Sequence, residues 1–407
     1  MIAAVFRDEW PRVVAALARR FGDLDVAEEA ASEAFVAAMA AWGGNGAQPP
    51  PNPGGWLMTT ATRKAIDRLR REHRREAKHA EAERLAAGAA PVHAIEDDQL
   101  RLIFTCTHPA LAPEARLALT LRLVAGLSVD EIARALLSSP AAIARRITRA
   151  KTKVRAAHIP FVVPERLSER LDGVLSVIYL IFNEGYLPGG GRELRVDLTD
   201  EAIRLARLLH DLLPDAPEAS GLLALLLLVD ARRPARVDAS GALVTLDQQD
   251  RSKWNPAFIA EGQALVRACV EYNRPGPYQI QAAINAVHSA ACRFGDTDWS
   301  VLATLYDQLY EVHPTPVVAL NRAVVSAEVD GPDAALATID QLALDDYHAL
   351  HAARAELLRR IGRIDAAERA YTRAIELAGN PAEIRHLTRR RGELATHAAA
   401  RLATERP

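Results

Sequence analysis

The sequence is poor in cysteine and has no long apolar run, and both shortages exclude whole classes of protein. Its 407 residues include three cysteines, Cys106, Cys269 and Cys292, which are too few and too scattered for a disulfide framework or a zinc site. The apolar run at 222–229 is too short to span a bilayer. Charges interrupt the first ten residues, MIAAVFRDEW, so they do not resemble a signal peptide. We expect a cytoplasmic protein that contacts no membrane and uses no metal or other cofactor.

Aromatic and β-branched residues are also scarce, and this scarcity predicts the fold class. Aromatic residues make up 5% of the chain. Alanine, leucine and arginine, which all favour helices, dominate instead. From residue 200 onward, amphipathic patterns alternate with Pro, Gly or Asp residues of the kind that begin or end helices. The sequence therefore predicts an all-α protein.

Motifs that carry catalysis are missing as well. The sequence has no glycine-rich phosphate loop, no Ser/His/Asp set and no cluster of metal ligands, so we expect no enzymatic activity. Cys106 and His108 resemble a ligand pair, but core packing is the favoured interpretation. The polar segment 230–254 leaves an enzyme site of carboxylates and arginines open, although a salt-bridge network or a linker is favoured. Its charged residues are Asp230, Arg232, Arg233, Arg236, Asp238, Asp247, Asp250, Arg251 and Lys253.

Charge is distributed unevenly along the chain. Residues 1–158 hold 23 basic and 18 acidic side chains, whereas the remaining residues hold 27 and 34. The first part therefore has a net charge of +5 at neutral pH and the rest a net charge of −7. A basic surface attracts the phosphates of nucleic acid, so we expect DNA binding in the first part only.

Residues 127–155 have the pattern of a helix-turn-helix. Apolar residues recur at helical spacing in 129–137, and Ser128 with Glu131 has the sequence of a capping box. Pro140 ends this pattern and suits the first turn of a second helix. That second helix is basic on its outer faces, and no acidic residue occurs from Ser138 to Arg155. This pattern predicts binding in the major groove of DNA, with a helical hairpin that has a solvated basic face as the alternative.

An acidic side precedes this motif on the helix predicted from Asp25 to Trp42. Its members are Asp25, Glu28, Glu29 and Glu33. Acidic residues stabilise the first turn of any helix, which is the structural interpretation. A docking face for a basic partner is the functional one.

Another candidate site begins at Trp56, after the turn-rich loop 43–55. Threonines follow the tryptophan, and the helix then becomes strongly basic. Proteins hold single-stranded DNA with aromatic rings beside cations that contact phosphates. A core tryptophan beside a solvated charged face is the alternative. After about residue 72 the apolar pattern fades, which predicts a linker at 76–95.

The order of these elements resembles that of a bacterial sigma factor of the extracytoplasmic-function group. The resemblance spans about residues 2–158 and lies in DVAEEAASEAFVAAMAAW, WLMTTATRKAIDRLRR and ALTLRLVAGLSVDEIARALLSSPAAIARRITRAKTKVR. Such factors bind core RNA polymerase and direct it to promoter DNA. The resemblance implies a region 2 domain at 1–75 and a region 4 helix-turn-helix domain at 96–158.

The resemblance also implies three groups of binding residues, and it matches the loop 43–55 to the loop that captures an extruded base of the −10 element. The polymerase-binding group is Asp25, Glu28, Glu29 and Glu33. The −10 group is Trp56, Thr59, Thr60, Arg63, Lys64, Asp67, Arg68 and Arg71. The −35 group is Ser139, Ala141, Ala142, Arg145, Arg146, Arg149, Lys151 and Lys153.

The remaining residues are predicted to form a helical extension that a minimal sigma factor does not have. The segments 319–342 and 351–374 align at an offset of 32 residues, and the second resembles a tetratricopeptide repeat. We predict helices at 159–310 and repeats of this type at 311–395, whose concave surface would bind a protein or peptide partner. With this tail, essentially the whole chain resembles a subgroup of these sigma factors with a long helical C-terminal extension.

We interpret the chain as a sigma factor for promoter-specific initiation whose tail modulates its activity. One alternative is a repressor or activator that uses only the helix-turn-helix, and another is a DNA-binding domain fused to a ligand-sensing or enzymatic tail. The tail either covers the basic helices or braces the region 4 domain. Burial of an apolar face outweighs screened surface attraction, and the segment after IPFVVP is strongly apolar, so we expect bracing.

Overall fold

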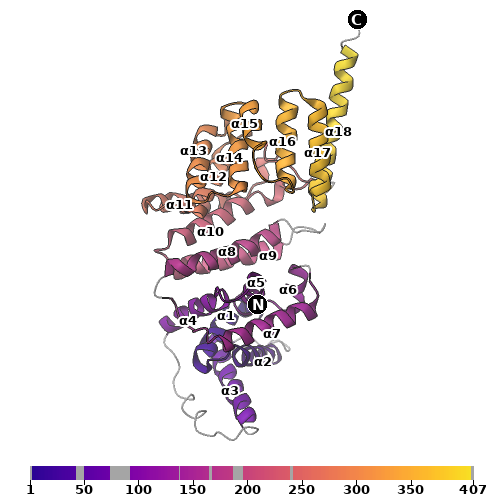
Figure 1. Ribbon diagram of the computed structural model, residues 1–407. Coiled ribbons are helices and arrows are strands. Elements are labelled where there is room, and N and C mark those ends of the chain that lie inside the picture. The colour runs from indigo at the N-terminus through magenta and orange to yellow at the C-terminus, as the bar shows by residue number, and fades with distance from the viewer. Residues whose placement is uncertain are drawn as a thin grey trace. The chain divides into compact units, whose positions relative to one another are not determined.

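The computed structural model describes residues 2–42, 50–73, 92–136, 138–164, 167–186, 196–238 and 242–404. The chain forms two compact units, Met1–Ile181 and Phe182–Pro407, which we call unit 1 and unit 2. No strand occurs in these described ranges, where one isolated antiparallel bridge joins Val237 to Leu243. The predicted all-α fold is confirmed (Figure 1). None of the described helices combines the length and the apolarity that crossing a membrane requires.

Unit 1 begins with a helical bundle that buries an aromatic cluster. Trp10 and Phe35 are buried with their ring centroids 5.7 Å apart, and Phe6 packs against both. Asp23 caps the second helix, because its carboxylate accepts hydrogen bonds from the N–H groups of Asp25 and Val26. The helices of the bundle are α1 (Ile2–Phe21), α2 (Leu24–Trp42) and α3 (Pro53–His73).

The predicted helix-turn-helix follows, and its local signals act as expected. Ser128 Oγ accepts from the N–H of Glu131 at 3.2 Å, and the Glu131 carboxylate accepts from the N–H of Ser128 at 2.7 Å, so the capping box is confirmed. Ser139 caps the second helix of the motif, which has Pro140 in its first turn. The helices here are α4 (Val92–Cys106), α5 (Pro113–Leu123), α6 (Val129–Ala135) and α7 (Pro140–Ala156). Cys106 is fully buried in α4, in agreement with the packing interpretation.

The helix-turn-helix packs directly on the N-terminal bundle, because α1 contacts both α4 and α5. Gly126, in the turn before α6, has a φ of 76°. A Cβ atom added there would lie 3.0 Å from the Trp10 ring and 3.1 Å from the Phe6 ring. Both the left-handed backbone and this close approach favour glycine. A second contact joins Arg19 of α1 to the fully buried Asp98 of α4, 3.1 Å apart.

The boundary between the units falls inside α8 (Leu167–Tyr186). The first part of α8 packs on the end of α4, where Arg170 donates to the carbonyl of Phe104 at 2.7 Å and lies over its ring. Residues 159–181, which the sequence assigned to the extension, therefore cluster with unit 1.

Unit 2 is built around α10, which contacts α9, α11 and α12. Residues 222–228 of α10 are all buried, which explains their uniform apolarity. A Cβ atom added at Gly262 of α11 would lie 2.6 Å from the Leu228 side chain, so the two helices approach closely. The helices of unit 2 after α8 begin with α9 (Val196–Leu212), α10 (Pro217–Asp230), α11 (Pro256–Glu271), α12 (Pro277–Ala290) and α13 (Trp299–Val312).

The C-terminal part of unit 2 consists of stacked helical hairpins. They comprise α14 (Pro316–Val329), α15 (Pro332–Ile339), α16 (His348–Arg360), α17 (Ile364–Leu377) and α18 (Pro381–Thr404), each in contact with the next (Figure 1). Gly331 and Gly362, with φ values of 93° and 80°, occupy equivalent turns of successive hairpins. Ala335 and Ala367, which the sequence alignment paired, are both fully buried. The predicted helical-repeat architecture is confirmed.

Candidate polymerase and DNA interface

Most of the −35 candidates share the outer side of α7. Arg145 and Arg149 are exposed at a spacing of four residues, and Arg146 is partly exposed beside them. In the part of the chain that the structure describes, these three guanidinium groups have no ion-pair or hydrogen-bond partner. Because the protein itself does not neutralise these three cations, they are available to contact DNA phosphates or the edges of guanine bases. The other exposed or partly exposed candidates on this helix and its cap are Ser139, Ala141, Ala142 and Lys153.

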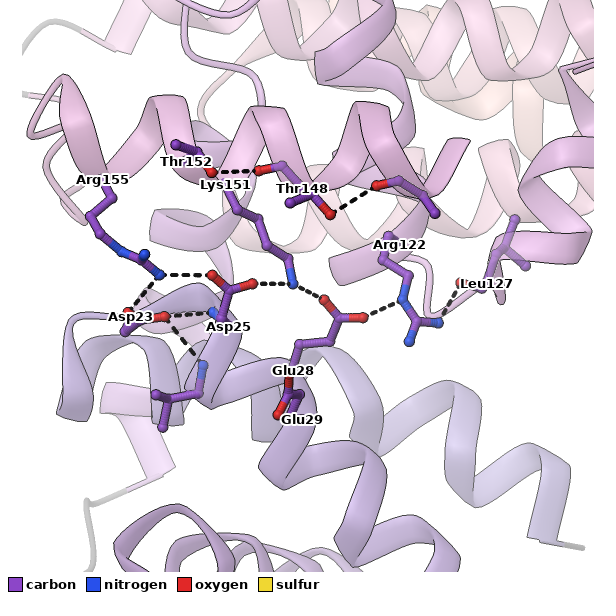
Figure 2. A network of polar contacts seen from close by, with 12 residues as sticks. Asp23, Asp25, Glu28, Glu29, Arg122, Leu127, Thr148, Lys151, Thr152 and Arg155 are labelled. Atoms are coloured by element: carbon purple, nitrogen blue, oxygen red, sulfur yellow. Dashed lines mark hydrogen bonds and ion pairs between the residues drawn. The ribbon is translucent and has the colours of Figure 1, made fainter. Parts of the chain in front are cut away.

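Lys151 lies on the other side of α7 and is not brought together with these residues. Its side chain is only 9% exposed, and its Nζ atom lies 2.9 Å from Asp25 Oδ1 and also pairs with Glu28. Figure 2 shows the lysine reaching from α7 toward the first turns of α2. The sequence contained this signal, because Lys151 follows Ile147 by four residues and precedes Val154 by three, on the buried stripe.

The acidic candidates on α2 form two separate groups. Asp25 and Glu28 face the helix-turn-helix, where Glu28 accepts from Arg122 as well as Lys151. Arg155 Nη2 bridges Asp25 and Asp23 at 2.7 and 2.8 Å, so the end of α7 is tied to the start of α2 (Figure 2). Asp23, Arg122 and Arg155 were not predicted from the sequence, because the contacts that they make join segments far apart in the chain.

The second group faces the −10 helix instead. Glu29 pairs with Arg68 and Glu33 pairs with Lys64 of α3, the latter at 3.3 Å. The side chains of Glu29 and Glu33 are 51% and 44% exposed. All four acidic candidates therefore have a cationic partner within the chain. Glu28 is close to fully buried, whereas Glu29, Glu33 and, at 37%, Asp25 remain open to a second partner.

The cations around Asp25 keep this carboxylate ionised. Burial by itself raises the pKa of Asp25, but the hydrogen bond and the charge of Lys151, together with Arg155, outweigh burial and lower the pKa below its usual value. Asp25 is therefore negatively charged at neutral pH and attracts whichever cation reaches it. A cavity of about 310 Å³ adjoins this network and is lined partly by Asp23, Asp25, Lys151 and Arg155.

The −10 candidates on α3 have a mixed environment. The Trp56 side chain is partly exposed, and its ring centroid lies 5.0 Å from that of the buried Trp42. Thr60 is partly exposed, and Lys64 and Arg68 are occupied by the acids of α2. The exposed candidates are Thr59, Arg63, Asp67 and Arg71. Residues 43–49 of the predicted base-capturing loop and 76–91 of the predicted linker lie outside the described residues.

Models of known families match three parts of the chain. Sigma-70 region 2 matches residues 5–75, and sigma-70, region 4 matches residues 101–154. A protein of Rhizobium meliloti (strain 1021), described as uncharacterized protein R00370, is 45% identical over 403 residues and covers 96% of this chain and 95% of its own. The chain belongs to the extracytoplasmic-function sigma factors. This sigma factor acts in transcription initiation.

The extension of the sigma factor matches a different family. Residues 170–270, which begin in α8, match a family of unknown function (DUF6596). A solved structure described as a thermophilic TPR protein, TTC0263 of Thermus thermophilus, is similar to 49% of this chain and to 92% of its own length, at 19% identity and a TM-score of 0.36. The polymerase and −10 candidates of the sigma factor lie within the region 2 match, and the −35 candidates lie within the region 4 match.

Proposed function

We propose that this sigma factor binds core RNA polymerase through the acidic side of α2 and directs it to specific promoters through α3 and α7. The observation that carries the proposal is the exposed row Arg145, Arg146 and Arg149 on the second helix of a helix-turn-helix. This row has no partner among the described residues, whereas the buried Lys151 and the exposed Arg155 of the same helix are paired with acidic residues at the start of α2. A helix that leaves its outer cations free and pairs its inner ones is suited to a major groove.

Polymerase docking uses the two acidic groups differently in this proposal. Glu29 and Glu33 are about half exposed, so a basic surface can reach them without moving the helix-turn-helix. Glu28 is only 11% exposed and becomes available only when Lys151 leaves it, whereas Asp25 is 37% exposed but shares its charge with Lys151 and Arg155. Docking through all four acids therefore requires α7 to separate from α2. A polymerase surface would replace these internal cations one for one, so the electrostatic cost of opening is offset by the new contacts.

The extension modulates this activity by bracing, in our proposal, and takes no catalytic part. Residues 167–181 of α8 belong to unit 1, and the hydrogen bond from Arg170 to Phe104 joins them to the end of α4, within the region 4 domain. The helical hairpins of unit 2 have the architecture of repeats that bind protein or peptide partners. Signals that reach unit 2 would then act on region 4 through the continuous helix α8.

Run-off transcription with core polymerase tests the proposal. The wild-type protein should give transcripts from specific promoters, and the double variant Glu29→Lys/Glu33→Lys should lose most of its binding to core polymerase in a pull-down. The double swap Glu29→Lys/Arg68→Glu is the matched control for folding, because it keeps an ion pair between α2 and α3. This swap variant should fold normally, and its binding to core polymerase should be weaker than that of the wild-type protein because Glu29 is lost.

A regulator that uses only its helix-turn-helix is the competing function. Such a protein would bind promoter DNA without polymerase and would not be captured by core enzyme. If Glu29→Lys/Glu33→Lys binds polymerase as well as the wild-type protein does, these two acids serve only as ion-pair partners of α3. That result would contradict the proposed docking surface.

A further inference from the structure

Unit 2 contains a cluster of arginines without carboxylate partners. Arg232 follows α10, Arg236 follows the short 3-10 helix η2 (Arg233–Ala235), and Arg251 begins the 3-10 helix η3 (Arg251–Lys253). η2 contacts η3, and Arg232 interacts electrostatically with both other arginines. We call these three residues the arginine cluster. None of them forms an ion pair with any residue that the structure describes.

The neighbouring charges behave differently. Arg233 lies next to Arg232 in the sequence, but it pairs with Asp230 and, at 2.8 Å, with Asp200. Asp238 pairs with Arg389 at 3.2 Å. The salt-bridge network expected in the segment 230–254 is therefore present, and the arginine cluster stands outside it.

Several hydrogen-bond donors of the cluster are buried without an acceptor. They are Arg232 Nε, Arg251 Nη2 and Nε1 of Trp254. The guanidinium of Arg251 lies 4.6 Å from the ring centroid of Trp254, whose side chain is 5% exposed. Buried donors are normally satisfied, because an unmade hydrogen bond in the interior costs free energy. Three such donors on adjacent residues indicate that an acceptor from outside the chain belongs here.

Other contacts hold the guanidinium groups in place. Arg251 Nη1 donates to the carbonyls of His288 and Ala291, both at 2.6 Å. Arg232 Nη2 donates to Asn285 Oδ1 at 2.7 Å, and Arg236 lies 3.8 Å from the ring centroid of Tyr186. Fixed cations lose little conformational entropy when a ligand binds. Arg236 and Arg251 are also partly exposed, so a ligand from solvent can reach the cluster from their side.

The charge of the cluster favours a dianion. Burial and the charges of Arg232 and Arg251 lower the pKa of His288 to about 4, so this neighbouring imidazole is neutral at pH 7. Asp296 is the carboxylate that acts on Arg251. Three guanidinium groups and one carboxylate leave two positive charges. A phosphate group close to its dianionic form neutralises both, whereas a single carboxylate leaves one.

We propose that the arginine cluster binds the phosphate group of a small phosphorylated molecule. The planar forks of the guanidinium groups match phosphate oxygens in pairs. The buried rings of Tyr186 and Trp254 each lie against one arginine and support the guanidinium groups in place. This site lies in unit 2 and goes beyond the sigma activity proposed for unit 1.

Titration of the full-length protein with inorganic phosphate tests the proposal, in the absence of polymerase and at constant ionic strength maintained with chloride. Calorimetry should show one saturable site, and the indole N–H signal of Trp254, assigned with Trp254→Phe, should shift with the same midpoint. Arg236→Gln and Arg251→Gln should each weaken the affinity roughly tenfold or more, because each removes a charged hydrogen-bond donor. Arg322→Gln is the matched control, since Arg322 also lies near an aromatic ring but pairs with Asp307.

The possible outcomes distinguish a specific phosphate site from non-specific attraction of phosphate to a basic surface. Loss of binding in both cluster variants with retention in Arg322→Gln supports the proposal. Absence of saturable binding by the wild-type protein would overturn it, and so would equal weakening by all three substitutions. If citrate binds at the cluster and phosphate does not, the ligand is a carboxylate and the phosphate assignment is wrong. Should a glutamine variant fail to fold, Arg236→Lys and Arg251→Lys keep the charge but lose the planar fork, and unchanged phosphate affinity in both would contradict the proposal.

Discussion

Lys151, on the helix expected to contact DNA, donates a hydrogen bond of 2.9 Å to Asp25, on the helix expected to contact polymerase. The same lysine pairs with Glu28, and both of these side chains are close to fully buried. The two candidate surfaces therefore restrain each other in this arrangement. Glu28 is covered while α7 stays in place, whereas Asp25 remains 37% exposed but shares its charge with Lys151.

Substitution of Lys151 should release this restraint. We expect Lys151→Met to strengthen binding to core polymerase several-fold and to lower the melting temperature of the protein, because Glu28 loses one of its two buried partners. Lys153→Met removes the same charge from an exposed position of the same helix and serves as the control. Pull-down and thermal melting measure both effects. Identical behaviour of the two variants would show that the ion pairs do not limit docking.

The exposed arginines of α7 should carry −35 binding. Arg145→Ala and Arg146→Ala should each cost about 1–3 kcal/mol if the side chain contacts a guanine in bidentate fashion. If the side chain contacts a phosphate instead, the slope of affinity against salt should fall by about one. Arg267→Ala removes an exposed arginine of unit 2 and should change neither quantity. An unchanged affinity and an unchanged slope in both α7 variants would rule out this surface.

Trp56 should contribute both to packing and to promoter opening. Its ring packs partly on Trp42, so Trp56→Ala should lower the melting temperature by less than the removal of a fully buried tryptophan, whose loss costs about 3–5 kcal/mol. Open-complex formation should fall more in Trp56→Ala than in Trp56→Phe, because phenylalanine retains a ring for stacking. Permanganate footprinting of melted promoter DNA measures the second effect. Normal opening by a less stable Trp56→Ala protein would assign the ring to packing alone.

Removal of the extension should impair transcription. A fragment of residues 1–158 lacks the part of α8 that packs on Phe104, and we expect it to be less stable and less active than the full-length protein. A fragment of residues 1–186 keeps all of α8 and should recover the stability of unit 1. Run-off assays and melting curves compare the three proteins. Higher activity from the 1–158 fragment would contradict bracing and support a covering role for the tail.

Stability should fall as the pH falls from about 6.5 to about 4, because of His288. Its pKa is lowered from 6.5 to about 4 by burial and by Arg232 and Arg251, so in this range the unfolded chain binds a proton that the native protein does not. The free energy of unfolding should fall by at most roughly 1.4 kcal/mol for each pH unit. His288→Asn should flatten the dependence, whereas the exposed His313→Asn should leave it unchanged. Denaturant titrations in buffers without phosphate measure the slope, and an unaltered slope in His288→Asn would refute the assignment.

The sequence by itself determined the elements of this protein and their order. The capping box of Ser128 and Glu131, the start of α7 at Pro140 and the buried stripe through Ile147 and Val154 all depend on residues a few positions apart. The same holds for the repeated hairpins, since Gly331 and Gly362 each enable a local turn. Interactions of this range are set by backbone sterics and helical period, and they hold whatever the rest of the chain does.

Only the tertiary structure decided which charges meet. Asp25 and Lys151 are 126 residues apart in the sequence, and each lies in a charged run whose members look equivalent until the side-chain contacts between α7 and α2 distinguish them. Helical period already placed Lys151 on the buried stripe with Ile147 and Val154, but only the contacts with α2 show that its charge is paired. In unit 2, Arg233 gained carboxylate partners while Arg232 beside it gained none, because successive residues of a turn point in different directions. Electrostatic partnership depends on distance in space, and sequence periodicity does not specify that distance between separate helices.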